Sequence, residues 1–68
     1  MISENGWKLV MKDGLGVVVG SPIYNFRGEL AIITSMDEPP HKLSSEGFVT
    51  TTLGRHYAGV YNLKWVKI

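Results

Sequence analysis

The 68-residue sequence contains no cysteine. Disulfide bridges and thiolate metal ligands are therefore excluded, and with them the framework typical of small secreted domains. Ordering a chain this short costs on the order of 100 kcal/mol in conformational entropy, which burial alone must offset. Aliphatic and aromatic residues make up 44% of the chain, which is enough to supply a core and excludes a polar disordered tail as the main description.

The sequence also lacks any long apolar run. None approaches the ~20 residues of a membrane-spanning helix, and Glu4, Asn5 and Gly6 occupy positions where a signal peptide needs basic and then apolar residues. We therefore expect a cytoplasmic protein with no membrane contact. The length predicts a single domain over residues 1–68, in which residues 1–6 are a flexible N-terminus.

A strong excess of charge is missing as well. Seven basic and six acidic residues leave a net charge of +1, too balanced to indicate a nucleic-acid partner by bulk electrostatics. Residues 54–57 and 64–67 are locally basic, whereas Asp37, Glu38 and Glu46 make the middle locally acidic. This mild asymmetry keeps nucleic-acid binding open as an alternative.

Eight glycines and three prolines divide the chain into apolar runs of about four to eight residues, the pattern of strands and turns. No segment has the apolar spacing of an amphipathic helix, so we expect almost no α-helix. Turns are predicted at Lys12-Asp13-Gly14 and Asn25-Phe26-Arg27-Gly28. About five short strands are predicted, at residues 8–11, 15–19, 29–36, 48–53 and 64–68, with a brief extended stretch at 23–24 and a turn or single 3₁₀ turn within 57–63.

Residues 29–36 form the clearest predicted strand. Alternation places Leu30, Ile32, Thr34 and Met36 on one face and Ala31, Ile33 and Ser35 on the other. Both faces are mostly apolar, so this strand is expected to be central. Residues 37–47, with two consecutive prolines, are predicted to be the longest irregular segment, and long loops are often functional.

Several short blocks of residues, taken together in order, resemble a known group of proteins. The blocks are Asn25-Phe26-Arg27-Gly28-Glu29, Pro39-Pro40-His41-Lys42, Ser44-Ser45-Glu46-Gly47-Phe48-Val49, Arg55-His56-Tyr57 and Asn62-Leu63-Lys64-Trp65-Val66. They resemble small uncharacterised proteins encoded by tailed bacteriophages and prophages. The resemblance covers roughly residues 16–67. The sequence departs from the group's pattern at the inserted Glu46 and at Ala58-Gly59, which replaces Pro-Ser.

The resemblance implies a phage origin, a location in the cytoplasm of the host cell, no assigned activity and a small SH3-like barrel. The expected fold is therefore all-β, an SH3-like barrel of about five short antiparallel strands, with a 3₁₀ turn before the last strand. That turn is how SH3-like barrels close, and it agrees with the independent interpretation of residues 57–68.

Enzymatic residues are hard to find in this sequence. The two histidines, His41 and His56, could join a metal site only with carboxylates such as Asp37 or Glu38, and a solvated or loop-bracing role is the stronger interpretation. There is no cysteine, and no serine lies in a Gly-x-Ser-x-Gly elbow. We predict that the protein is not an enzyme and has no catalytic residue, metal or cofactor.

Aromatic and basic residues are the more informative group. Phe48 and Trp65 are expected to fill the core, whereas Trp7 and Tyr61 could lie inside or at the surface. Tyr57 and Tyr61 are four residues apart and follow Arg55-His56, an arrangement that predicts a stacking platform for a protein or for single-stranded nucleic acid. Arg27 and Glu29 flank Gly28, either as a polar docking pair or as an ordinary solvated turn.

These observations favour a non-enzymatic protein-interaction module, a phage-type accessory protein that binds a host or phage protein. The predicted binding surface is the loop that contains Pro39, Pro40 and His41, here called the Pro-Pro-His loop, together with residues 55–61. The predicted partner-binding residues are Arg27, Glu29, His41, Lys42, Arg55, His56, Tyr57 and Tyr61. The alternative is a nucleic-acid-binding barrel that uses the aromatic residues together with Lys42, Arg55, Lys64 and Lys67. Homodimerisation through an exposed edge strand is compatible with either function.

Overall fold

The computed structural model describes residues 6–68, which form six β-strands and one 3₁₀ helix. Most of the predicted flexible N-terminus, residues 1–5, lies outside the described residues. The elements in chain order are β1 (Trp7–Met11), β2 (Pro22–Tyr24), β3 (Leu30–Glu38), β4 (Phe48–Thr51), β5 (Gly54–Tyr57), η1 (Ala58–Tyr61) and β6 (Leu63–Lys67). No helix within residues 6–68 is long and apolar enough to cross a membrane.

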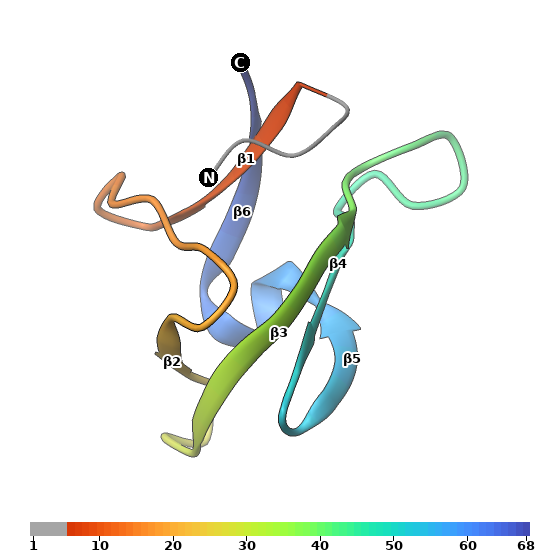
Figure 1. Ribbon diagram of the computed structural model, residues 1–68. Helices are drawn as coiled ribbons and strands as arrows, with labels where there is room; N and C mark the ends of the chain where they lie inside the picture. Colours follow the sequence, from red (N-terminus) through yellow and green to blue (C-terminus); the bar gives the residue numbers. More distant parts are fainter. Residues whose placement is uncertain (1–5) are drawn as a thin grey trace.

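The strands form two antiparallel sheets (Figure 1). One contains β1 and β6, and the other has the order β2-β3-β4-β5. The all-β antiparallel fold and the 3₁₀ turn before the last strand are confirmed. The strand ladders within residues 6–68 do not join into the single closed barrel that the resemblance implied, because β1 and β6 form a sheet that includes no other strand.

The prediction of a strand at residues 15–19 is wrong. Only Gly16 pairs there, in an isolated bridge with Val10, and the N–H of Val17 donates to the carbonyl of Leu9 at 3.0 Å. Beyond it the chain turns, since the N–H of Ser21 donates to the carbonyl of Val18 at 2.9 Å. A β-branched run favours extended backbone, but here the chain turns before a regular ladder with β1 can form.

The central strand is confirmed at β3, which extends two residues further than expected, to Glu38. The predicted face of Met36 is wrong. Met36 is buried together with Ala31 and Ile33, because the register between β3 and β4 shifts on either side of Ser35. An irregularity of this kind turns the following side chains to the opposite face of the sheet.

The predicted strand at residues 48–53 is in fact two strands joined by a tight turn. β4 ends at Thr51, whose Oγ1 accepts the N–H of Leu53 at 2.9 Å and so closes the turn. Gly54 was expected to end a strand but begins β5, with a φ of +113° that the reversal requires. The strand β5 was missed by the sequence analysis.

The core lies between the two sheets, and η1 contributes Ala58 and Tyr61 to it. Its largest fully buried side chains are Leu9, Ile23, Ile33 and Val49. Trp65 is 7% exposed, so its predicted burial is confirmed, and Trp7 is half-buried against the same core. Phe48 is only half-buried, because β4 presents it to the outer side of the sheet, opposite Tyr57.

Candidate functional site

Strand β5 separates the predicted site into two surfaces. Alternate side chains of a strand point to opposite faces, so Arg55 and Tyr57 share one face and His56 points to the other. We call the first surface the aromatic face, made of Glu38, Phe48, Arg55 and Tyr57. We call the second the His56 hollow.

The aromatic face is built by cross-strand pairing. Phe48 lies directly opposite Tyr57, and their rings stack with centroids 4.5 Å apart and an interplanar angle of 24°. The guanidinium carbon of Arg55 lies 3.8 Å from the centroid of the Phe48 ring. Tyr57 remains 49% exposed, so this face offers stacked aromatic surface to solvent.

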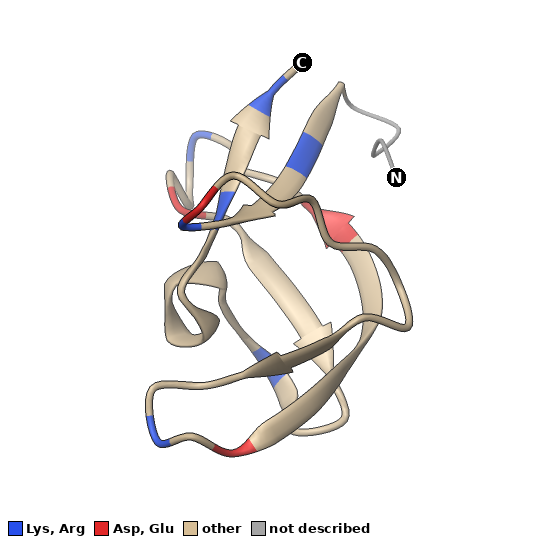
Figure 2. Ribbon diagram, turned by 90° about the vertical axis from the view of Figure 1, so that its left-hand side faces the viewer, with Lys and Arg blue, Asp and Glu red and all other residues tan. Residues whose placement is uncertain are grey.

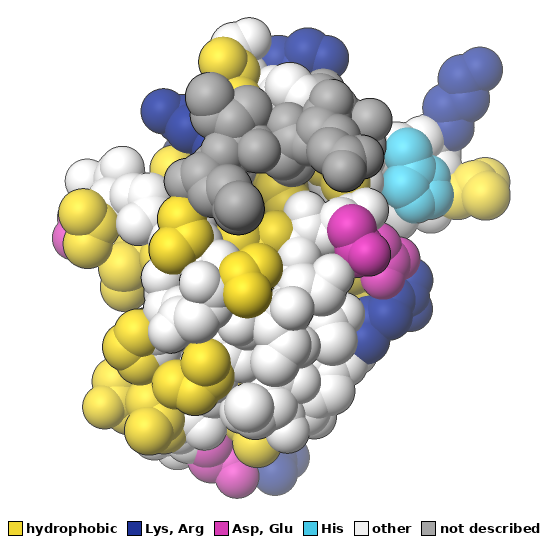
Figure 3. Space-filling model, viewed as in Figure 1, with side chains coloured by type: hydrophobic (Ala, Val, Ile, Leu, Met, Phe, Trp, Pro, Cys, Tyr) yellow, Lys and Arg dark blue, Asp and Glu magenta, His cyan; other side chains and the backbone are white. Residues whose placement is uncertain are grey.

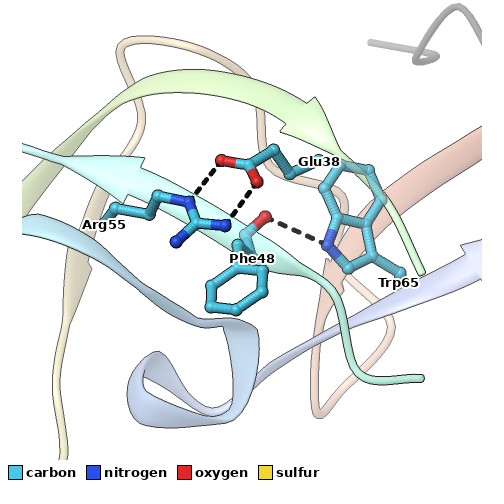
Figure 4. A network of polar contacts seen from close by, with 4 residues as sticks. All are labelled: Glu38, Phe48, Arg55 and Trp65. Carbon is cyan, nitrogen blue, oxygen red and sulfur yellow. Dashed lines mark hydrogen bonds and ion pairs between the residues drawn. The ribbon is translucent and has the colours of Figure 1, made fainter. Parts of the chain in front are cut away.

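Arg55 also forms a two-point ion pair with Glu38 (Figure 4). Its Nε donates to Oε1 of Glu38 at 2.6 Å and its Nη2 donates to Oε2 at 2.7 Å. These hydrogen bonds hold the pKa of the Glu38 carboxyl below its ordinary value and raise the pKa of Arg55. The pair ties β5 to the end of β3, where the Pro-Pro-His loop begins.

Acid is expected to remove the contribution of this pair to stability. Because the pKa of Glu38 is lowered by folding, the contribution is present at neutral pH and is lost as the pH falls through the lowered pKa. The wild type should therefore exceed Glu38→Gln in stability at about pH 7 and lose that advantage at about pH 2, which urea titrations of both proteins would measure. A Glu38 carboxyl that titrates by NMR at or above the ordinary glutamate pKa would contradict the assignment.

The His56 hollow is an open depression of about 440 Å³ on the other side of β5. It lies between the turn after β2, the turn before β5, and η1, and the N–H of Phe26 donates to the carbonyl of Val60 at 3.0 Å. Four predicted residues line it: Arg27, Glu29, His56 and Tyr61. Two segments about 25 residues apart in the sequence thus meet at one site.

The turn beneath Arg27 is held by Asn25. Its Oδ1 accepts the N–H groups of Arg27 and Glu29, both at 2.9 Å, and its Nδ2 donates to Oε1 of Glu29 at 2.9 Å. Gly28 has the expected positive φ, at +77°. The only ion pair within residues 6–68 is that of Arg55 with Glu38, so Arg27 is not paired with Glu29, and its guanidinium carbon lies 5.4 Å from the Phe26 ring centroid.

Tyr61 forms an inner wall of the hollow. It is 3% exposed, and its hydroxyl lies 2.9 Å from Oγ1 of Thr51 and 3.1 Å from Nδ1 of His56. The predicted stacking platform of Tyr57 and Tyr61 is therefore not formed, since Tyr57 stacks on Phe48 outside the core. Tyr61 acts on the site by positioning the His56 ring.

The other two predicted residues, His41 and Lys42, lie away from the hollow. His41 braces its own loop: its backbone pairs with Ser44, and its Nδ1 accepts the N–H of Leu43 at 3.1 Å. It borders a separate depression of about 330 Å³, which Glu38 and Trp7 also line. In Figure 3 a histidine lies beside the acidic side chains on this face.

Metal ligands do not gather at either histidine. Within residues 6–68 there is no group of three or more His, Cys, Asp or Glu side chains arranged to hold an ion. His41 and His56 lie at different surfaces, so they do not act together.

The basic residues proposed for nucleic acid do not form one surface (Figure 2). Lys42 is on the Pro-Pro-His loop, and Arg55 is paired with Glu38. Lys64 and Lys67 are on β6, where the Nζ of Lys67 lies 5.1 Å from the Trp7 ring centroid. With Lys8 on β1 they give the two-stranded sheet three lysines and no acidic residue.

Some residues that shape the surface were missed from the sequence. The apolar part of the hollow comes from Phe26, Leu53 and Val60, which occur in turns or η1 where no periodic pattern marks them. A second apolar patch covers the outer side of β2 and the start of β3 (Figure 3), where Tyr24 and Leu30 pair directly and both are exposed.

Glu46 and Gly59 contact each other. Oε1 of Glu46 accepts the N–H of Gly59 at 2.9 Å, at the start of η1. A Cβ at position 59 would collide with that oxygen. Glu46 and Gly59 therefore form a matched pair at the start of η1.

This contact predicts that the effect of Gly59→Ala on the free energy of unfolding depends on whether Glu46 is present. Gly59→Ala should destabilise the wild type by about 1 kcal/mol, because the new methyl group displaces the Glu46 carboxylate. In a Glu46→Ala background the same change should be neutral or stabilising by up to ~1 kcal/mol, since alanine restricts the unfolded chain. Equal effects of Gly59→Ala in both backgrounds, measured by urea unfolding, would rule out the coupling.

Comparisons with known protein families, curated proteins and solved structures found no significant match to this chain.

Proposed function

We propose that this protein is a non-enzymatic interaction module, a phage-type accessory protein that binds a host or phage protein through the His56 hollow and the adjoining aromatic face. The observation that carries the proposal is the meeting of Arg27, Glu29 and His56 around one open depression beside an exposed strand. The SH3-like fold that the resemblance implies is part of the proposal, and η1 before β6 is consistent with it.

The chemistry of the two surfaces supports protein recognition. The hollow combines exposed apolar side chains, among them Phe26 at 69% exposure, with the charged group of Arg27. Aromatic and arginine side chains are enriched at protein interfaces, because they bring large contact area with few torsions to immobilise. A shallow, mixed surface of this kind suits a protein segment.

Affinity capture from bacterial lysate tests the proposal. The bait variant Phe26→Ala/Arg27→Ala removes two exposed side chains at the hollow, while Leu43→Ala removes an exposed leucine from the Pro-Pro-His loop. We expect a partner that is retained by the wild type and by Leu43→Ala and is lost with the double variant. Equal retention by all three baits would show that the hollow is not the binding site.

Nucleic-acid binding is the second candidate, favoured by the lysines of the β1–β6 sheet. Lys8 and Lys64 lie on its outer face, and neither strand has an acidic residue. Phosphate contacts predict an affinity that falls steeply with salt. Labelled single- and double-stranded DNA and RNA that show no binding at micromolar protein in low salt would eliminate this candidate.

A further inference from the structure

Strand β5 has one hydrogen-bonding edge that no strand of residues 6–68 covers. It is the last strand of the order β2-β3-β4-β5 and lies at the open side of the molecule (Figure 1). Antiparallel ladders alternate, and the N–H of Ala58 donates to the carbonyl of Gly47 at 3.3 Å. Residues 54, 56 and 58 therefore face β4, and Arg55 and Tyr57 turn their backbone groups outward.

These outward groups have no partner within residues 6–68. Arg55 presents its N–H and its carbonyl, and Tyr57 presents its N–H. The carbonyl of Tyr57 is at the N-cap of η1 and accepts the first helical bond. The side chains of β5 are all exposed, so a further strand has access to this edge.

We propose that an extended segment of the partner protein binds by adding a strand to the free edge of β5. This inference rests on the proposed function and specifies how the partner is held. Backbone hydrogen bonds to Arg55 and Tyr57 supply the register, as in other cases of strand addition. The partner residue opposite Arg55 lies beside the aromatic face, and its neighbour opposite His56 lies beside the hollow, because paired residues share a face.

The side chains that line the His56 hollow indicate which residues the partner segment carries. Phe26, Leu53 and Val60 suit an apolar side chain at the position opposite His56. Glu29 is engaged by Asn25, whereas Arg27 has no ion pair within residues 6–68. The segment that fits therefore carries an apolar residue and, on the same face, an acidic residue that pairs with Arg27.

A second copy of the chain fits the edge less well. Two β5 edges paired about Arg55 would place like charges opposite each other. Pairing Arg55 with Tyr57 of the copy would need the Tyr57 carbonyl, which η1 already uses. The other edge strand of this sheet, β2, contains Pro22, which has no N–H to donate.

Substitution of Tyr57 by proline tests the inference, with alanine as the matched control. Tyr57 has φ −60° and ψ 146°, which proline adopts without strain. Both variants remove the phenol ring of tyrosine. Only Tyr57→Pro also removes the backbone N–H and places the proline ring at the edge of the strand. The probe is a set of peptides of about 12 residues, selected from a displayed random library against the wild type.

We expect the selected peptides to bind Tyr57→Pro at least ~10-fold more weakly than Tyr57→Ala. In the wild-type complex, amide hydrogen exchange at Arg55 and Tyr57 should slow by at least ~10-fold, while His56, already bonded to β4, changes little. This second measurement does not depend on any variant folding correctly.

The outcomes separate the two proposals. Peptides that bind at the hollow but bind both Tyr57 variants equally, without slower exchange at Arg55 and Tyr57, would overturn strand addition and leave the proposed function intact. Peptides that bind only elsewhere, or no selected peptide at all, would also overturn strand addition, and the affinity capture would then decide the proposed function. Protected edge amides in the free protein, with a dimer mass by light scattering, would assign the edge to a second copy.

Discussion

Gly47→Ala is expected to destabilise the protein by at least ~3 kcal/mol, which is comparable with the whole stability of a domain this small. Gly47 has a φ of +75°, where an L-residue with a side chain costs about 1–2 kcal/mol. A Cβ there would lie 2.5 Å from Cδ1 and 2.7 Å from Nε1 of Trp65, and 3.0 Å from the carbonyl oxygen of Glu38. The indole would be forced out of its buried position, and its hydrogen bond to the carbonyl of Phe48 would be lost.

Gly28→Ala is the matched control for this effect. Gly28 has a similar φ, at +77°, but nothing lies within 4 Å of a Cβ built there. Gly28→Ala should therefore lower the free energy of unfolding by only the ~1–2 kcal/mol that the unfavourable backbone conformation costs. Urea unfolding followed by circular dichroism compares the two variants, and a Gly47→Ala cost no larger than that of Gly28→Ala would contradict the close contact with Trp65.

Trp65→Ala is expected to cost about 3–5 kcal/mol and to leave little folded protein at room temperature. The indole fills the space between β6 and the end of β3, and only 7% of the residue is exposed. Trp65→Phe keeps part of this volume and should cost less. Phe26→Ala, at a residue that is 69% exposed, should change stability by no more than ~0.5 kcal/mol.

Urea unfolding of these three variants tests the assignment of the two aromatic residues. A Trp65→Ala protein within about 1 kcal/mol of the wild type would show that the indole is not part of the core. A large loss for Phe26→Ala would show that this ring supports the fold, and its use in the binding experiments would then be unsound.

The elements predicted correctly are those that residues close in the sequence determine. Asp13-Gly14 and Asn25 with Gly28 form turns through their own side chains and backbone conformation, and the alternation along β3 places Ala31 and Ile33 in the core. Strand formation at 15–19 and at β5 depends on which neighbour is available. Residues 15–19 have the better β-propensity yet pair only at Gly16, whereas β5, exposed on both faces, is completed by β4.

The sequence predicted several residues of the candidate site, but it did not predict which of them lie together. Arg27 and His56 are about 29 positions apart, and they meet at one hollow through the successive pairing of strands β2 to β5 and the hydrogen bond of Phe26 to Val60. The sequence grouped Tyr57 with Tyr61 by spacing, but Tyr57 ends β5 and stacks on Phe48, whereas Tyr61 lies in η1 with its side chain buried. The sequence does not distinguish an exposed leucine such as Leu53 from a buried one, because the same residue types occur in the core and at the surface.

A chemical-shift map of ¹⁵N-labelled protein titrated with a selected peptide tests the central claim most directly. Binding at the hollow and along β5 predicts that the largest amide shifts occur at Arg27, His56 and Tyr57, while Leu43 and Lys64 stay unchanged. The largest shifts on β1 and β6, with β5 unaffected, would contradict the account and favour the lysine-bearing sheet as the binding surface.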